Sequence, residues 1–229
     1  MGGLMSPPPD AAARDRSGRG AAACRRRAGG TRVIDCLLTR HTGLPRDHMG
    51  HRLSRSGRAL IIEAAARVYG LDLTGRDLAT DEHRRWLLPE HGRHASVAHC
   101  ADFSAVAFST GPRVGVDLQD ERDRPGAMRW LGTLLGQPRP ASIRDFAECE
   151  ALIKASHLTK ETFAGVRLPP WRPDWRPTNV GPYQVRSAAL GRGMHLALAA
   201  DEAAPVRWWR QPDRTADAVR TETLTLETA

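Results

Sequence analysis

Apolar residues in the first half of the chain fall into short alternating runs and one helical segment. Residues 33–38 read Val-Ile-Asp-Cys-Leu-Leu and predict a strand, which a polar connector follows. The segment 54–69 is rich in helix-forming residues, begins at the capping-type Ser54 and stops before Gly70, which tolerates a left-handed backbone. Small and β-branched residues then predict three short strands within 97–118.

The second half repeats this order of a helix followed by strands. A short helix is expected over 127–135 and a longer one over 145–157, with Asp145 as its cap and Glu148 completing a capping box. The prolines of 169–177 exclude regular structure there. An antiparallel set of strands is predicted to close the fold, at residues 183–185, 194–199 and 206–209.

These elements predict an α+β protein with two similar α+β lobes in one chain. The doubling follows from the pattern of elements, because no sequence repeat is obvious. We expect a disordered extension over 1–30, an N-terminal lobe over 31–115, a C-terminal lobe over 116–210 and a polar tail over 211–229.

The excess positive charge is concentrated in the N-terminal part of the chain. The net charge is +8, and residues 1–58 alone hold twelve Arg and four Asp, so the remainder is close to neutral. A basic surface attracts polyanions, but a nucleic-acid groove within the folded lobes is disfavoured. The first thirty residues lack the apolar region of a secretory signal, although an arginine-rich transit segment remains an alternative to disorder.

Cysteine usage and hydropathy suggest a cytoplasmic protein. The four cysteines form no CxxC pair and have no zinc-type spacing, so we expect free thiols in a reducing compartment. No apolar run reaches the roughly 18 residues that a membrane span requires.

The candidate chemistry lies in one strand end and one helix. Asp117 follows Val-Gly-Val at the end of an apolar strand, and Glu150 and Lys154 are four residues apart on a helix. An ordinary turn carboxylate and an exposed ion pair are the alternative interpretations. Together, however, Asp117 and Glu150 could supply the one or two carboxylates that Mg²⁺ uses beside substrate phosphates. Lys154 would neutralise phosphate charge, and His99 is either a phosphate ligand or a packed histidine.

Four segments carry a resemblance to the phosphopantetheinyl transferase superfamily, specifically its longer, pseudo-dimeric type. That family has a Gly-Lys-Pro element, a Ser-His strand, a Gly-(Val/Ile)-Asp-x-Glu strand and a Trp-x-x-Lys-Glu-(Ala/Ser)-x-x-Lys-Ala helix. The corresponding segments here are Gly92-Arg93-His94, Ala98-His99, Gly115-Val116-Asp117-Leu118-Gln119 and the run from Phe146 to Ala155. The resemblance extends more loosely from about Ser54 to Ala200.

The resemblance implies transfer of the 4'-phosphopantetheine arm from coenzyme A to a serine of an acyl or peptidyl carrier protein. Carried over, Asp117 and Glu150 would hold Mg²⁺, with Glu150 also helping to deprotonate the serine. Lys154 would stabilise the phosphate in flight. The coenzyme A nucleotide would be gripped by Arg93 and His99, with Arg52 as a helper. The internal doubling predicts a monomer, and neither nucleic acid nor membrane is an expected partner.

The sequence departs from the family pattern at several of these positions. Gln119 replaces the second acid, and its amide oxygen could still ligate magnesium without adding charge. Cys149 replaces the Lys before the helix Glu, Ala98 replaces Ser, and Phe146 replaces Trp. These changes leave open a divergent member that binds coenzyme A or carrier-tethered pantetheine but catalyses another reaction or none. A more remote alternative is an arginine-rich nucleic-acid-binding protein.

Overall fold

The computed structural model describes residues 32–40, 51–100, 103–122, 124–191 and 193–210, without the side chains of 51–55. The expected disordered extension over 1–30 and the polar tail over 211–229 therefore lie outside the described residues. The same is true of most of the connector between the first predicted strand and helix. Within the described ranges, no helix is both long and apolar enough to cross a membrane.

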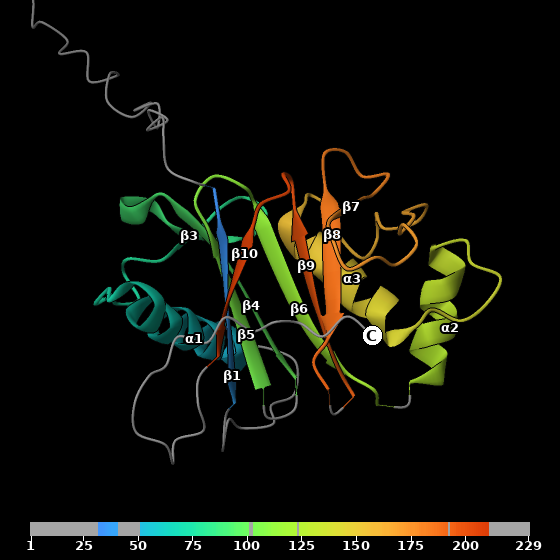
Figure 1. Cartoon of the computed structure of the whole chain (residues 1–229), viewed down its shortest axis with the longest axis horizontal. Helices are drawn as coiled ribbons and strands as arrows, with labels where there is room; N and C mark the ends of the chain where they lie inside the picture. Colours follow the sequence, from blue (N-terminus) through green and yellow to red (C-terminus); the bar gives the residue numbers. More distant parts are fainter. Residues whose placement is uncertain (1–31, 41–50, 101–102, 123, 192, 211–229) are drawn as a thin grey trace, which may run out of the picture. The chain divides into compact units, whose positions relative to one another are not determined.

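The first sheet has six strands in the order β10-β1-β5-β4-β3-β2 (Figure 1). Its strands are β1 (Ile34–Arg40), β2 (Ala79–Thr80), β3 (Trp86–Leu88), β4 (Arg93–Cys100), β5 (Phe103–Ser109) and β10 (Val206–Arg210), with a 3-10 turn η1 (Pro89–His91) before β4. The strand predicted over 33–38 is confirmed, and two of those predicted within 97–118 are β4 and β5. The very short strands β2 and β3 carry no alternating pattern and were not predicted.

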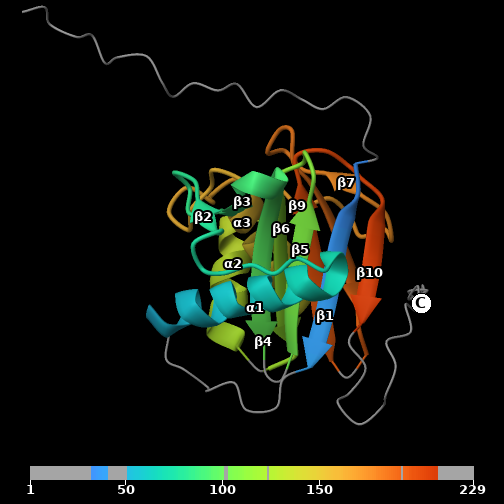
Figure 2. The ribbon, with the colours of Figure 1, turned by 90° about the vertical axis from the view of Figure 1, so that its left-hand side faces the viewer.

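Helix α1 (His51–Tyr69) lies across one face of this sheet (Figure 2). Leu60, Ile61 and Ala64 recur at helical spacing and are buried against the strands, which is why the segment forms an amphipathic helix here. The helix begins three residues earlier than predicted. Its predicted end is confirmed, because Gly70 follows with a φ of 67°.

The second sheet has four antiparallel strands in the order β6-β9-β8-β7. Its strands are β6 (Val114–Asp120), β7 (Arg176–Pro177), β8 (Gln184–Ala189) and β9 (Met194–Ala200), and the helices α2 (Pro125–Leu134) and α3 (Ile143–Ala155) precede β7. Both helices were predicted, with shifted ends. The chain is thus a mixed α and β structure with two sheets and few helices, compatible with the predicted α+β class.

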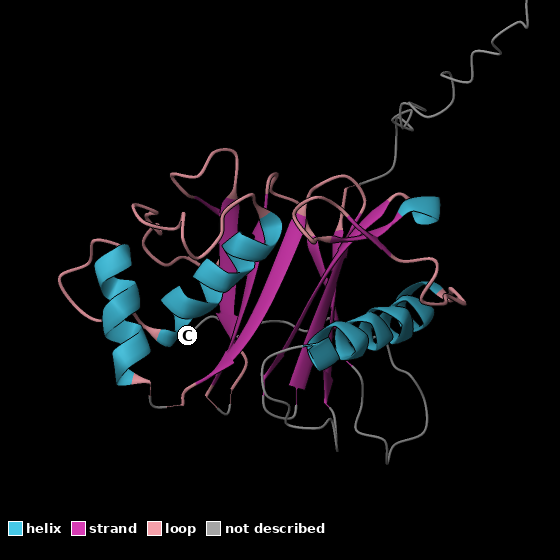
Figure 3. Ribbon diagram, turned by 180° about the vertical axis from the view of Figure 1, so that it is seen from behind, coloured by secondary structure: helices cyan, strands magenta, loops and turns pink. Residues whose placement is uncertain are grey.

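The two sheets face each other, and helices cover their outer faces (Figure 3). One core cluster lies between the sheets and joins apolar side chains of β1, β4, β5, β6 and β9. A second cluster lies between α1 and the first sheet, and a third lies between α2, α3 and the second sheet. The three cysteines described, Cys36, Cys100 and Cys149, are free and buried in these clusters, as expected for thiols outside a disulfide framework.

Strand β10 corrects one prediction. It was expected to extend the closing antiparallel set, but it pairs in parallel with β1, with Ile34 opposite Val206 and Leu38 opposite Arg210. The physical reason lies in Asp35, whose buried carboxylate accepts hydrogen bonds from Arg207 and Trp209 of β10. The last strand of the predicted C-terminal lobe therefore belongs to the first sheet, and the boundary after residue 115 stays a prediction.

Candidate functional site

Strand β6 presents polar residues to α3 because its side chains alternate between two faces. Val114, Val116 and Leu118 belong to the core between the sheets. The intervening residues Gly115 and Asp117 face the opposite side, where α3 packs. The Asp117 side chain is 7% exposed, so a carboxylate is buried at the junction of strand and helix.

Gly115 allows α3 to approach this strand closely. A β-carbon at Gly115 would lie 2.0 Å from the carbonyl oxygen of Ala151 and 2.7 Å from the amide nitrogen of Ala155. Both are main-chain atoms, so no side-chain rotation can relieve the overlap. The last turn of α3, which carries Lys154, therefore rests directly on β6.

The start of α3 differs from the prediction. Ser142 is the N-cap residue, and its hydroxyl accepts a hydrogen bond of 3.2 Å from the Asp145 amide. The Asp145 carboxylate accepts one of 2.8 Å from the Ser142 amide, which completes a capping box one turn earlier than expected. Asp145 is consequently not the cap, and Glu148 is not the second member of the box.

Lys154 joins α3 to both sheets. Its ammonium donates to the Asp117 carboxylate at 2.7 Å, to the Val116 carbonyl at 3.0 Å and to the Val97 carbonyl of β4 at 3.3 Å. The interpretation of Glu150 and Lys154 as an exposed pair does not describe this geometry, because Lys154 pairs with a buried acid on another element. The structure thus brings two of the predicted residues, Asp117 and Lys154, into contact.

Gln119 connects Asp117 to an arginine that the sequence analysis did not single out. Its amide nitrogen donates to the second Asp117 oxygen at 2.6 Å, and its amide oxygen accepts from Arg124 at 2.7 Å. Arg124 also donates to Asp120 at 2.7 Å. The oxygen that was expected as a magnesium ligand is therefore engaged by a guanidinium.

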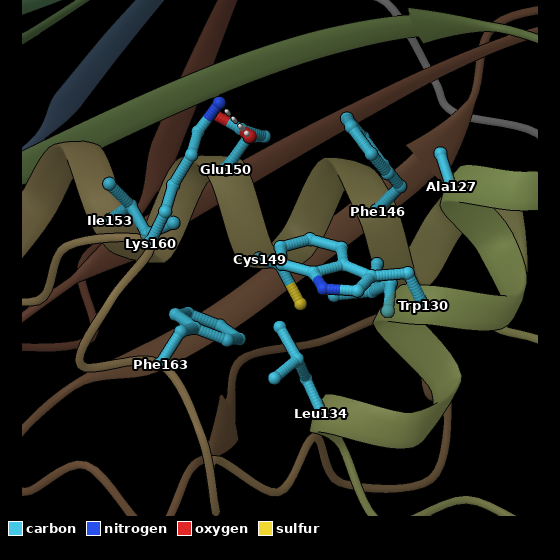
Figure 4. A pocket seen from close by; sticks show the side chains of 10 residues that line it. Ala127, Trp130, Leu134, Phe146, Cys149, Glu150, Ile153, Lys160 and Phe163 are labelled. Atoms are coloured by element: carbon cyan, nitrogen blue, oxygen red, sulfur yellow. Dashed lines mark ion pairs between the residues drawn. The ribbon is translucent and has the colours of Figure 1, made fainter.

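Glu150 lies one turn before Lys154 on α3 and borders a pocket of about 230 Å³ between α2 and α3. Its carboxylate is 3.7 Å from the ammonium of Lys160, and the side chain is 23% exposed. Figure 4 shows this ion pair at one end of the pocket, away from Trp130 and Leu134. The other lining residues are apolar, namely Ala127, Leu131, Phe146, Cys149, Ile153 and Phe163.

His99 lies near the end of β4 and is exposed. Loss of surrounding water around part of the ring lowers its pKa below the ordinary 6.5, and the Lys154 ammonium lowers the pKa further. The Asp117 carboxylate acts in the opposite direction. On β4, His99 follows by two residues Val97, whose carbonyl accepts from Lys154, so the strand brings His99 beside this junction.

The structure does not bring Arg93 to the same place. Arg93 and His99 are at opposite ends of β4, which at about 3.3 Å per residue separates their backbones by roughly 20 Å. The Arg93 guanidinium lies 3.8 Å from the centre of the Tyr69 ring. Arg93 therefore lies away from the Asp117–Lys154 contact, and its role beside His99 at the nucleotide end stays a prediction. Arg52 belongs to α1, and its side chain lies outside the described part of the structure.

Glu148 and Arg176 form a buried pair that the sequence analysis missed. The Arg176 guanidinium and the Ser187 hydroxyl both donate to one Glu148 oxygen. Arg176 also donates to the Pro169 carbonyl at 3.2 Å, which ties the proline-rich loop to α3. A charged residue on the inner face of an amphipathic helix was the available signal, and the capping interpretation of Glu148 concealed it.

The donor atoms at this junction suit magnesium in chemical type. Among the residues that the structure describes, no group of three or more His, Cys, Asp or Glu side chains gathers as a metal site. Magnesium commonly takes only one or two protein carboxylates and completes its shell with water and substrate phosphate. Asp117 and Glu150 are carboxylates of this type, but both Asp117 oxygens already accept hydrogen bonds, from Lys154 and Gln119, and Glu150 pairs with Lys160. A magnesium ion would have to displace some of these contacts, and no contact in the described structure joins the two carboxylates.

Comparison with known proteins does not identify the function of this site. A scan against models of protein families found no match, and a search of curated proteins found none either. The geometry of the junction and the motifs that meet there are therefore the basis for inferring a function.

Proposed function

We propose that this chain is a Mg²⁺-dependent 4'-phosphopantetheinyl transferase that acts on coenzyme A and a serine of an acyl or peptidyl carrier protein. The observation that carries the proposal is the 2.7 Å contact between Lys154 and Asp117, which joins two of the motifs. His99, from a third motif, lies within electrostatic reach of both groups. Convergence of three motifs from different elements supports a shared site more strongly than each motif does in the sequence.

The repeated topology supports the pseudo-dimeric fold as part of this proposal. In each sheet a first strand is followed along the chain by a helix and then by a β-hairpin. The first strand pairs with the second strand of that hairpin. The orders β1-β5-β4 and β6-β9-β8 follow this rule, with α1 and α3 as the helices. The candidate site would then lie where the two similar lobes meet, between β4 and β6.

In the proposed reaction, the serine oxygen attacks the phosphorus that bears the pantetheine arm. A new phosphorus–oxygen bond forms, the bond to the bridging oxygen breaks, and its electron pair leaves with adenosine 3',5'-bisphosphate. Glu150 accepts the serine proton, directly or through water. Bound Mg²⁺, held by Asp117 and Glu150, would neutralise charge on the diphosphate.

Lys154 is suited to stabilise the transferring phosphoryl group. An ammonium has three N–H donors, and all three have protein acceptors here. The longest contact, 3.3 Å to the Val97 carbonyl, is the one that a phosphate oxygen would replace at least cost. The other two contacts would keep the ammonium aimed at the site.

The pocket beside Glu150 gives the proposal a place for the apolar part of the arm next to the reacting phosphate. Its walls are apolar except for Glu150 and Lys160. An uncharged, branched hydrocarbon segment would fit these walls, whereas the nucleotide would not. We therefore assign the nucleotide to the His99 side and the arm to the side of α2 and α3.

Transfer of a fluorescent coenzyme A label to a carrier protein tests the proposal. We expect Asp117→Ala and Glu150→Ala each to abolish labelling, because each removes a carboxylate from the site. Asp72→Ala, which removes an exposed carboxylate elsewhere, is the matched control and should label normally. Persistent labelling by both site variants at the wild-type rate would refute the assigned roles.

One observation favours the divergent alternative, in which the protein binds coenzyme A or tethered pantetheine without transfer. The Gln119 oxygen accepts from Arg124, so the third acidic ligand of the family pattern has no substitute. Intact-mass analysis of a carrier protein incubated with coenzyme A, Mg²⁺ and this protein separates the two functions. Only transfer adds the mass of the arm to the carrier.

A further inference from the structure

Two strands from different sheets meet at the candidate site. Strand β3 pairs with the first three residues of β4, Arg93 to Ala95. Beyond them β4 lies beside β6, although the two strands belong to different sheets (Figure 1). Main-chain groups on facing strand edges need partners, because a buried N–H or C=O group without a hydrogen bond is costly. Atoms outside a strand ladder must therefore satisfy the main chain where β4 and β6 meet.

Side chains supply these partners at Val116. In an antiparallel sheet, alternate residues turn both main-chain groups toward the same neighbour, and those of Val116 turn away from β9. The Val116 amide donates to the Ser96 hydroxyl at 3.0 Å, and the Val116 carbonyl accepts from the Lys154 ammonium at 3.0 Å. Lys154 also donates to the Val97 carbonyl of β4 at 3.3 Å. One hydroxyl and one ammonium thus take the place of a ladder between the two strands.

The contact between Ser96 and Val116 is buried. Ser96 is 5% exposed and Val116 is 0% exposed, so solvent cannot replace the hydroxyl as an acceptor. Loss of the hydroxyl would leave the amide without a partner, which costs the full desolvation of that group. The hydroxyl therefore fixes the peptide group before Val116, and the ammonium fixes the peptide group after it.

These contacts affect the candidate site through Asp117, the next residue of β6. With both peptide groups of Val116 held, the direction of the Asp117 side chain is set, and its carboxylate accepts from Lys154 at 2.7 Å. Lys154 in turn needs the Val116 carbonyl in place, because this carbonyl is one of its three acceptors. Ser96 thus acts on Asp117 and Lys154 through Val116.

A purely structural role for Ser96 is the alternative. A hydroxyl that only completes a buried hydrogen bond would affect stability and leave the geometry of Asp117 unchanged. Ser109 on β5 is a matched example, because it is also buried and its hydroxyl donates to the Pro112 carbonyl in a turn. Substitution of the two serines therefore distinguishes loss of a buried hydrogen bond from loss of position.

We infer that Ser96 is a positioning residue of the candidate site, which fixes β6 against β4 and thereby places Asp117 and Lys154 for the reaction. The connection between the strands is a property of the fold, whereas its effect on transfer rests on the proposed function. One measurement on the main chain and one on the reaction therefore test the two parts separately.

Amide hydrogen exchange of the full chain, followed by NMR, tests the connection between the strands. We expect the Val116 amide to be protected in the wild type, because the Ser96 hydroxyl holds it in a buried place. Ser96→Ala should speed its exchange by about tenfold or more relative to amides in the middle of β5, as loss of one hydrogen bond predicts. Ser96→Thr keeps the hydroxyl and should keep the protection. Exchange of the wild-type Val116 amide at the rate of an unstructured amide would overturn the inference.

The kinetics of carrier labelling test the consequence for the site. We expect Ser96→Ala to lower kcat by about tenfold or more, because a misplacement of about 1 Å can cost roughly a hundredfold. KM for coenzyme A should stay within about threefold, since the nucleotide is assigned to the His99 side. Ser96→Thr should retain most of the wild-type kcat. Ser109→Ala, the matched control, should be less stable than the wild type but label with the same kinetics.

Two kinetic outcomes would contradict the positioning role. One is an unchanged kcat in folded Ser96→Ala, and the other is an equal loss of kcat in Ser109→Ala. If Ser96→Ala does not fold, Ser96→Cys decides, because its sulfur has a similar place but is a weak acceptor. Wild-type kcat in that variant would overturn the inference, and a loss of several-fold would support it.

The two measurements also distinguish failure of this inference from failure of the proposed function. A protected Val116 amide that Ser96→Ala exposes, without any labelling by the wild type, would support the connection between the strands and refute the transfer. Labelling by the wild type, combined with an unprotected Val116 amide, would uphold the transfer and overturn the inference.

Discussion

The close contact between Gly115 and α3 gives a prediction whose size can be worked out from the structure. Gly115→Ala would place a β-carbon 2.0 Å from the Ala151 oxygen and 2.7 Å from the Ala155 nitrogen. Real β-carbons essentially never approach another heavy atom within 3.0 Å, so helix and strand must separate by about 1 Å. Because α3 bears on β6 along its last turn, the whole turn must move.

Overpacking of this kind typically lowers the free energy of unfolding by about 1 to 3 kcal/mol. In a protein of this size, each kcal/mol lowers Tm by about 2 to 4 °C. The same substitution also restricts the unfolded chain, which alone would stabilise the protein by about 0.4 to 1 kcal/mol. Gly126→Ala measures that second effect, because a β-carbon at Gly126 has no atom within 4 Å.

Urea titration of the full chain, followed by tryptophan fluorescence, compares the two variants. We expect Gly126→Ala to be as stable as wild type or slightly more stable, and Gly115→Ala to be clearly less stable with the same m value. Folded Gly115→Ala protein should also lose labelling of a carrier protein, since the shift displaces Lys154 from Asp117. Equal stability of the two glycine variants would refute the packing argument.

Three further predictions concern other charged groups. Glu148→Gln should lower the free energy of unfolding by about 3 to 5 kcal/mol in urea titration, because it leaves the buried Arg176 without its anionic partner; an effect below 1 kcal/mol would contradict this reasoning. Burial alone would raise the pKa of Asp35, but hydrogen bonds from arginine, tyrosine and tryptophan lower it below 3.8. The Asp35 carboxylate therefore binds a proton more readily in the unfolded chain than in the folded protein. The free energy of unfolding should then decline as the pH falls through the folded pKa. Asp35→Asn should therefore show a shallower loss of Tm below about pH 4 than wild type, and identical slopes would count against the predicted coupling. In NMR titrations the pKa of His99 should lie below 6.5 and rise in Lys154→Met, while an unchanged value would mean that the two groups are not neighbours.

Local sequence signals predicted those elements of the fold that are decided locally. Helix α1 ends at the glycine that its pattern indicated, and the buried strands follow their alternation. Local sequence signals failed where a residue or strand far away in the sequence determines how a strand pairs. The pairing of β10 depends on Asp35, which lies on β1 and is far away in the sequence. The short strand β3 pairs with the edge of β4, and β2 pairs in turn with β3.

The sequence predicted which residues belong to the candidate site better than it predicted the contacts between them. Matching motifs selected Asp117 and Lys154, and these two residues do meet. The position of Arg93 could not be inferred, because the motif gives the order along the chain but not the length of the strand between it and His99. Arg124 lies beyond the end of the motif, and only the fold around Gln119 draws it in.

The pairing of β1 with β10 has a consequence for biosynthesis. Strand β1 is translated early, and its outer edge stays unpaired until β10 has been synthesised. Arg207 of β10 follows Asp35 of β1 by 172 residues. Until β10 leaves the ribosome, that edge presents unpaired backbone groups to any neighbouring nascent chain. Recombinant yield should thus respond to expression rate and chaperone supply more than to the stability of the finished protein.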